Sequence, residues 1–80
     1  MYFVYAIKSL VRNYIYVGLT NNLERRISDH NRGGNKTTKP YLPFVMIYSE
    51  KFETRSEARI KEKYLKSGIG KEFLKRIIWF

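Results

Sequence analysis

The stretches YFVYAIK at residues 2–8 and YIYVG at residues 14–18 decide the fold of this chain. Both are rich in β-branched and aromatic residues, which favour strands on a partly buried sheet. The segment between them contains Arg12-Asn13, a pair suited to a turn. The two stretches therefore predict an antiparallel hairpin.

The residues after this hairpin predict a helix and a third strand. Thr20-Asn21-Asn22 offers N-cap residues before LERRISDHN at residues 23–31, and Gly33 ends that segment. A polar, basic loop follows, bracketed by Gly33-Gly34 and by Pro40 to Pro43. FVMIY at residues 44–48 is a continuous apolar run, which is typical of a central or well-covered strand.

Two further helices are predicted downstream. Thr54-Arg55-Ser56-Glu57 matches a capping box, which opens a helix that runs to about Gly68. KEFLKRIIWF at residues 71–80 predicts a short amphipathic helix, whose apolar residues are Phe73, Leu74, Ile77 and Ile78. The order ββαβαα predicts an α+β fold, a small three-stranded antiparallel sheet flanked by helices, in one domain over residues 1–80.

The composition excludes several classes of protein. Hydrophobic residues make up 44% and aromatic residues 16% of the 80 residues, which is too rich for a disordered tail. The absence of cysteine excludes a disulfide-stapled miniprotein, a zinc finger and a thiol enzyme. No apolar run approaches the ~20 residues of a membrane helix, and no signal-peptide core follows Met1. We therefore expect a cytoplasmic protein without a membrane partner.

The charge balance points to a polyanionic partner. Sixteen Lys and Arg against seven Asp and Glu give a net charge of +9. Nucleic acid is favoured over a membrane surface, because each neutralised phosphate releases counterions and no helix here has the composition of a membrane-surface helix. The alternative is that the charge only keeps a small domain soluble. On the nucleic-acid interpretation, the candidate contacts are Arg25, Arg32, Lys36 and Lys39.

Several familiar chemistries find no support in the sequence. There is one histidine and no GxSxG, so serine-nucleophile catalysis is disfavoured. The pair Gly33-Gly34 lacks the Gly-Lys-Ser/Thr of a phosphate-binding P-loop. A glycosidase-type carboxylate pair is also disfavoured, because the acids are few and nearly all stand next to bases.

Helical geometry separates the two adjacent arginines of the first predicted helix. At about 100° per residue, Arg26 and His30 flank the apolar stripe of Leu23 and Ile27, whereas Arg25 points to solvent. An arginine held at the edge of a core can bind a phosphate. The alternatives are that the stem of Arg26 only covers the core while its head is solvated, and that His30 is a packed or surface histidine.

A carboxylate stands on an apolar stripe of the second predicted helix. Glu62 shares its face with Ala58 and Leu65, and a partly buried charge needs an ion pair or a metal. A structural salt bridge and a functional role are both open at this point. Tyr5 and Tyr16, on the two strands of the hairpin, are on their own ordinary packing residues with a polar tip.

The combination of these segments resembles the GIY-YIG nuclease superfamily. FVY at residues 3–5 is followed by YVG at 16–18, then by LERRISDH and by EARIKEKYLK, in the order and spacing of that family. The resemblance covers residues 2 to about 67 and is closest to the small stand-alone bacterial branch called excinuclease-C-like. It implies two adjacent strands, an arginine on the first helix and a glutamate on a later helix.

The resemblance also implies roles for individual residues. It places the family's tyrosines, glycine, arginine, histidine and metal-binding carboxylate at Tyr5, Tyr16, Gly18, Arg26, His30 and Glu62. Three features depart from the family. FVY lacks the glycine of the first motif, Leu19 stands where the excinuclease domain has a lysine, and the asparagine that closes the excinuclease site has no clear counterpart.

The implied function is a metal-dependent endonuclease acting on DNA, structure-selective or non-specific, of the kind used in repair or recombination. One Mg²⁺ or Mn²⁺ ion would be held by Glu62, and Arg26 would neutralise charge on the phosphate. Tyr16, in preference to Tyr5, would take the proton of the attacking water with help from His30. RNA as the substrate stays open. A non-catalytic nucleic-acid-binding module and an unrelated interaction domain are the alternatives.

Overall fold

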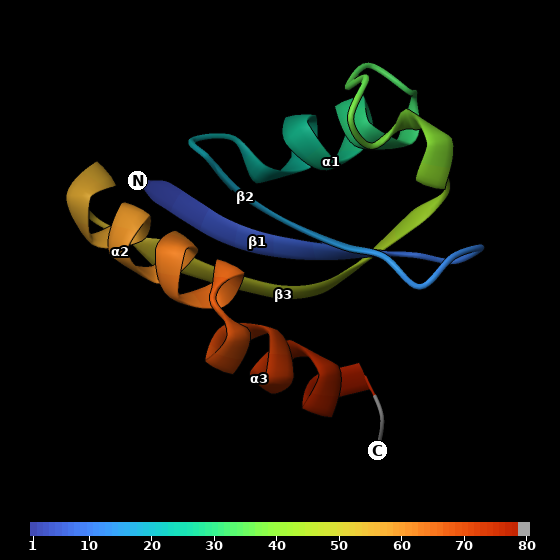
Figure 1. Cartoon of the computed structure of the whole chain (residues 1–80). Helices are drawn as coiled ribbons and strands as arrows, with labels where there is room; N and C mark the ends of the chain where they lie inside the picture. Colours follow the sequence, from blue (N-terminus) through green and yellow to red (C-terminus); the bar gives the residue numbers. More distant parts are fainter. Residues whose placement is uncertain (79–80) are drawn as a thin grey trace.

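The computed structural model describes residues 1–78. Its sheet consists of β1 (Tyr2–Ser9), β2 (Ile15–Thr20) and β3 (Phe44–Phe52), all antiparallel, in the spatial order β2-β1-β3. The predicted hairpin is therefore present as β1 and β2, and β3 adds to the other edge of β1 (Figure 1).

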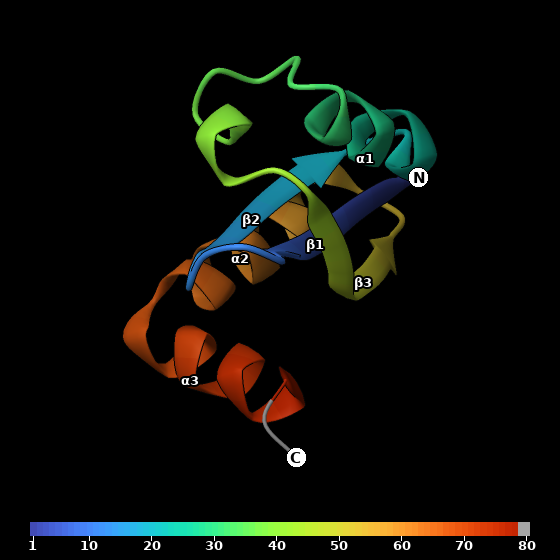
Figure 2. The same cartoon turned by 90° about the vertical axis from the view of Figure 1, so that its right-hand side faces the viewer.

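Helices cover both faces of this sheet. α1 (Leu23–Asn31) lies on one face, and α2 (Arg55–Lys66) and α3 (Gly68–Ile78) lie on the other, as Figures 1 and 2 show from two directions. A short 3-10 turn, η1 (Lys39–Tyr41), lies between α1 and β3. The order ββαβαα and the α+β class are thus as the sequence predicted.

β1 is the centre of the core. Four successive side chains of this strand, Val4 to Ile7, are fully buried. Because side chains alternate along a strand, Val4 and Ala6 pack against α2 and α3, whereas Tyr5 and Ile7 pack on the side of α1. Two apolar layers, one on each face of a single strand, are what allow so small a chain to bury a core.

Local capping fixes the ends of the helices as the sequence predicted. The side chain of Asn22 accepts a hydrogen bond from the backbone N–H of Arg25, 3.2 Å away, at the start of α1. Gly33 follows that helix with a φ of 77°, a left-handed conformation that favours glycine. Thr54 and Glu57 form the reciprocal capping box of α2.

Three details differ from the sequence-based expectations. β3 is an edge strand, not a central one: only Phe44 of it is buried, and Val45 and Met46 are 44% and 43% exposed. α3 begins at Gly68, three residues before the predicted start, and the last two residues of the predicted helix lie outside the described residues. Within residues 1–78, no helix has the length and apolarity needed to cross a membrane.

Candidate active site

Tyr5 and Gly18 face each other across the β1–β2 hairpin. They are register partners, so their side-chain positions share the face covered by α1. The ring of Tyr5 crosses over Gly18 so closely that a Cβ atom at position 18 would lie 2.6 Å from Cζ of Tyr5. Glycine is therefore required at this position because only a missing side chain lets Tyr5 lie across the neighbouring strand.

His30 is buried between Tyr5 and the loop after α1. Its Nε2 atom lies 2.8 Å from the Tyr5 hydroxyl, and its Nδ1 atom lies 2.9 Å from the hydroxyl of Thr38. Both His30 and Thr38 are fully buried. The helical wheel placed His30 at the edge of the core, but the histidine is fully buried. The reason is that the loop around Thr38 folds over it and closes it off from solvent.

The hydrogen-bond network assigns the tautomer of His30. The Thr38 hydroxyl donates to the backbone carbonyl of Asn35 at 3.4 Å, so it accepts from Nδ1–H of His30. Nε2 is then unprotonated and accepts the hydroxyl proton of Tyr5. The arrangement gives Tyr5 a buried hydrogen-bond acceptor and fixes the ring of His30 at both nitrogens.

Arg26 lies beside the same tyrosine, at the edge of the core where the helical wheel placed it. The Tyr5 hydroxyl, an acceptor next to the guanidinium, raises the pKa of Arg26 and holds it in the charged form. Arg26 is partly buried, whereas Arg25 is exposed. The two arginines nevertheless line one hollow of about 210 Å³ at the start of α1, so both can meet an anion from that side.

Burial sets the proton affinities of the buried pair. It raises the pKa of Tyr5, and this outweighs the lowering by the adjacent Arg26. Burial also lowers the pKa of His30, and the positive charge of Arg26 lowers it further. Both groups are therefore neutral at pH 7, with the tyrosine as donor and the histidine as acceptor.

Tyr16 completes the aromatic cluster on this face. Its ring centroid lies 4.9 Å from that of His30 and 6.4 Å from that of Tyr5. Unlike Tyr5, it is only partly buried. The cluster therefore presents one buried tyrosine and one tyrosine that solvent and a substrate can reach.

Glu62 comes from α2, and its charge reaches this cluster. The carboxylate is one of the charges that raise the pKa of Tyr5, after burial and Tyr16. Its side chain is 13% exposed, as expected for a residue on the stripe of Ala58 and Leu65. Its cationic neighbours are Lys66 at 3.3 Å and Arg59 at 3.9 Å, both 55% exposed and both on the same helix.

Comparison with known proteins identifies the family of this chain. The family model described as the GIY-YIG catalytic domain matches residues 1–75. The chain belongs to the GIY-YIG family. The matched range includes all six positions on which the resemblance depended, from Tyr5 to Glu62.

Relatives of this GIY-YIG chain are small proteins of similar length. UPF0213 protein SH2523 of Staphylococcus haemolyticus is 40% identical over 77 residues, which are 95% of this chain and 93% of that protein. UPF0213 protein CPE1444 of Clostridium perfringens is 43% identical over 82% of this chain and 71% of its own length. The solution NMR structure of UPF0213 protein BH0048 from Bacillus halodurans is 31% identical, with a TM-score of 0.57 over 96% of this chain and 85% of that one.

The donor set of the GIY-YIG domain fits a metal held by a single carboxylate. Among residues 1–78 there is no cluster of three or more His, Cys, Asp and Glu side chains that could enclose an ion. Mg²⁺ keeps several waters and is commonly bound through one or two carboxylates plus substrate phosphate oxygens. The carboxylate of Glu62, whose partners are two cations that are each 55% exposed, suits that mode of binding.

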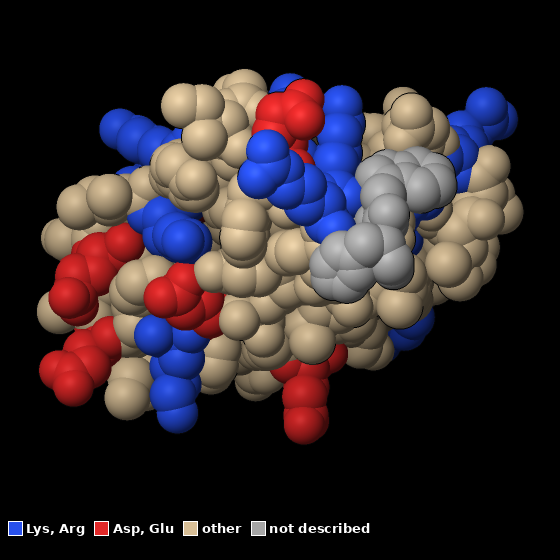
Figure 3. Space-filling view, turned by 90° about the horizontal axis from the view of Figure 1, so that it is seen from below, with Lys and Arg blue, Asp and Glu red and all other residues tan. Residues whose placement is uncertain are grey.

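The predicted nucleic-acid contacts lie at the surface on the α1 side. Lys36 and Lys39 are exposed in the loop after α1, and Arg32 is exposed but pairs with Asp29. Positive charge is not confined to that side. Figure 3 shows Lys and Arg across the face formed by α2 and α3, with acidic side chains gathered mainly at the end where α2 begins.

Thr38 is the residue of this site that sequence reasoning missed. It lies in a polar loop without periodicity, and its neighbour Thr37 is exposed. Nothing in the residue types distinguishes the two threonines. Only the fold of the loop shows that Thr38 is the one that contacts His30.

Proposed function

We propose that this GIY-YIG chain is an endonuclease that hydrolyses phosphodiester bonds in DNA with one divalent ion, Mg²⁺ or Mn²⁺. The observation that carries the proposal is a charged arginine beside a buried tyrosine, with a partly buried carboxylate whose charge acts on the pKa of that tyrosine. Arg26 lies beside Tyr5, and the charge of Glu62 reaches the same hydroxyl. A chain with a net charge of +9 also favours a polyanionic substrate.

Arg26 would supply the electrostatic part of catalysis. Phosphodiester hydrolysis places additional negative charge on the non-bridging oxygens, and a fixed cation at that point stabilises the transition state. The guanidinium is oriented by Tyr5 and remains charged because its pKa is raised. Tyr5 thus has a positioning role, since its own proton is donated to His30.

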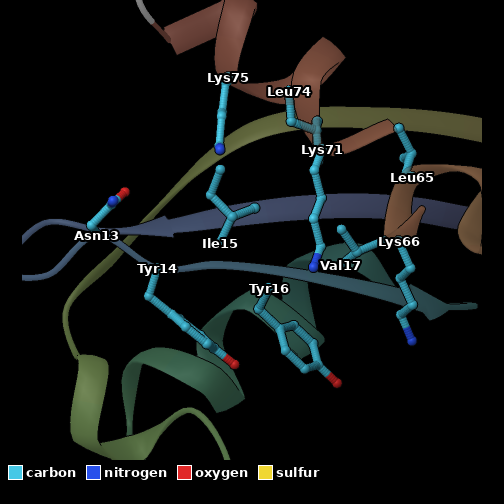
Figure 4. A pocket seen from close by; sticks show the side chains of 10 residues that line it. All are labelled: Asn13, Tyr14, Ile15, Tyr16, Val17, Leu65, Lys66, Lys71, Leu74 and Lys75. Atoms are coloured by element: carbon cyan, nitrogen blue, oxygen red, sulfur yellow. The ribbon is translucent and has the colours of Figure 1, made fainter. Parts of the chain in front are cut away.

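Tyr16 is the better candidate for the base that takes the proton of the attacking water. Burial raises the pKa of Tyr5, so that residue is less available in the deprotonated form that a general base needs. Tyr16 is partly exposed, and its hydroxyl points away from the sheet in Figure 4. His30 contacts both rings and would hold the cluster in place.

Glu62 is the residue that would hold the divalent ion. A bound Mg²⁺ or Mn²⁺ ion supplies charge stabilisation to the leaving oxygen. The part that the chain itself contributes is a carboxylate on a well-anchored helix: the capping box and the buried Leu65 fix α2 against the sheet. The two groups would act on the same phosphodiester, with Glu62 holding the ion and Arg26 neutralising the phosphate oxygens.

The experiment is a cleavage assay over a panel of substrates. The purified chain is incubated with end-labelled single-stranded, double-stranded and branched DNA and with a matched RNA, in Mg²⁺, in Mn²⁺ or in EDTA. We expect metal-dependent fragments from at least one DNA substrate and none in EDTA. Retained DNA binding without cleavage in either metal would favour a non-catalytic binding module. Leu19, which replaces the lysine of the excinuclease domain, would then help to explain the lack of activity.

A further inference from the structure

A groove runs along the free edge of β2, outside the cluster described above. Its volume is about 440 Å³, within the range of pockets that hold small organic ligands. β2 forms one wall, and α2 and α3 form the other (Figure 4). The residues that line it are Asn13, Tyr14, Ile15, Tyr16, Val17, Leu65, Lys66, Lys71, Leu74 and Lys75.

The charged residues that line this groove are all positive. Three of its ten lining residues are lysines, and none of the ten is acidic. In Figure 4 the ammonium groups of Lys75 and Lys71 extend from α3 toward β2, next to Ile15 and Val17, and Lys66 extends farther along the same edge. Lys71 and Lys75 are one helical turn apart, so their positions are about 6 Å apart along α3.

The floor of the groove is apolar. Its apolar lining consists of Ile15 and Val17 from β2, Leu65 from α2 and Leu74 from α3. A row of cations above an apolar floor suits a ligand that has both phosphates and flat heterocycles. One strand of nucleic acid has this chemistry and exposes it, whereas a duplex keeps its bases stacked inside.

The groove leads directly to the candidate active site. Tyr16 belongs to both, because it lines the groove and packs against His30. At the same end, Lys66 lines the groove and lies 3.3 Å from the carboxylate of Glu62. A strand lying in the groove would therefore reach the residues to which hydrolysis is assigned.

From these observations we propose that the β2 edge groove binds one strand of the nucleic-acid substrate, with Lys71 and Lys75 contacting consecutive phosphates. The proposal rests on the proposed function for its substrate class and adds α3 to the binding surface. The competing explanation is that the lysines only shield the free edge of β2 from pairing with another chain.

The test measures binding separately from cleavage. A short labelled oligothymidine is titrated with the full chain in EDTA at several salt concentrations. The double variant Lys71→Gln/Lys75→Gln is compared with Lys51→Gln/Lys63→Gln, which removes the same charge from exposed positions outside the groove. We expect the groove variant to bind about tenfold more weakly. The slope of log K against log salt concentration should become shallower by about 1.4, since each single-strand phosphate contact contributes about 0.7 to that slope. The control should bind nearly as wild type.

Several outcomes would overturn the groove assignment. Equal loss in both double variants would mean that only net charge matters, and no loss in either, with new self-association of the groove variant, would mean that the lysines shield the edge. Amide chemical-shift changes in the wild-type chain give a second measurement if the variant fails to fold: they should appear at residues 13–17 and 66–75. If the groove variant binds more weakly than the control variant but the wild type cleaves no DNA, the groove assignment stands and the proposed hydrolysis is refuted. If the wild type cleaves DNA but the groove variant binds as well as the wild type, the hydrolysis stands and the groove assignment is refuted.

Discussion

Gly18 faces Tyr5 across the hairpin, and the ring of the tyrosine fills the space that a side chain at position 18 would need. The same hydroxyl that passes over Gly18 lies 2.8 Å from Nε2 of His30. One small residue on β2 therefore determines where a buried hydroxyl from β1 meets a histidine from α1.

Gly18→Ala should consequently damage both folding and activity. The new Cβ would overlap Tyr5, and such overpacking of a core costs about 1–3 kcal/mol of unfolding free energy. Gly68→Ala is the matched control, because a Cβ at Gly68 meets nothing within 4 Å and alanine is the better helix former. Thermal melts and cleavage rates of both variants test this. Equal stability of the two variants would show that Tyr5 can move away at no cost.

Thr38 should act through the orientation of His30. Thr38→Val keeps the shape but leaves Nδ1–H of a buried histidine without an acceptor, at a cost of about 1–3 kcal/mol. Thr38→Ser keeps the hydroxyl and should retain most of the stability and activity. The imidazole ¹⁵N shifts of His30 provide the direct measurement: we expect a protonated Nδ1 in the wild type and in the serine variant. Equal stability and equal imidazole ¹⁵N shifts in Thr38→Val and Thr38→Ser would refute the tautomer assignment.

The adjacent arginines should separate into two roles. Arg26→Ala removes the cation beside Tyr5 and should lower the cleavage rate by about 10²–10³. Arg25→Ala removes an exposed cation and should mainly weaken binding. For duplex DNA, the slope of log K against log salt concentration should become shallower by about 0.9. Single-turnover rates at saturating protein distinguish these effects. Equal rate losses in two well-folded variants would mean that the hollow they share holds the scissile phosphate through both side chains.

The buried histidine should make the fold sensitive to mild acid. Burial lowers the pKa of His30 in the folded chain, so the unfolded chain binds more protons once the pH falls below about 6.5. Stability from this source is complete above that pH and is lost as the pH falls toward the lowered folded pKa. The melting temperature should therefore drop between about pH 7 and pH 5. Because His30 is the single histidine of the chain, His30→Gln should remove the slope in this window, and an unchanged slope would assign it to other groups.

Local sequence signals predicted most of the elements but not all of their places in the fold. The capping box at Thr54 and the stop at Gly33 are local features and were predicted correctly, and the cap of α1 is Asn22, one of three candidates that the sequence offered. The run at residues 44–48 was predicted to be a central or well-covered strand because it is continuously apolar, yet it forms an edge and only Phe44 of it is buried. Apolar content alone does not show which strand has neighbours on both sides.

The candidate site shows the same division. Helical spacing placed Arg26, His30 and Glu62 on or beside apolar stripes, but their roles in a site followed only from the resemblance to the GIY-YIG family. The contact of Thr38 with His30 and the groove beside β2 depend on how a loop and α3 pack against the sheet. Neither is encoded in a local pattern, so neither could be derived from residue types alone.

The carboxylate of Glu62 provides the decisive comparison. Glu62→Gln keeps the volume of the side chain but removes the charge that would hold a divalent ion. Its cationic partners Arg59 and Lys66 are both 55% exposed, and ion pairs with exposed partners contribute only about 0–1 kcal/mol. The variant should therefore melt close to the wild type.

The measurement is single-turnover cleavage of a labelled DNA by wild type and Glu62→Gln in Mg²⁺, with DNA affinity and melting temperature determined on the same preparations. We predict that cleavage disappears in the variant, that DNA affinity persists or increases because a negative charge has left the surface that faces phosphate, and that stability is preserved. Cleavage at the wild-type rate by the folded variant would contradict the proposed nuclease site.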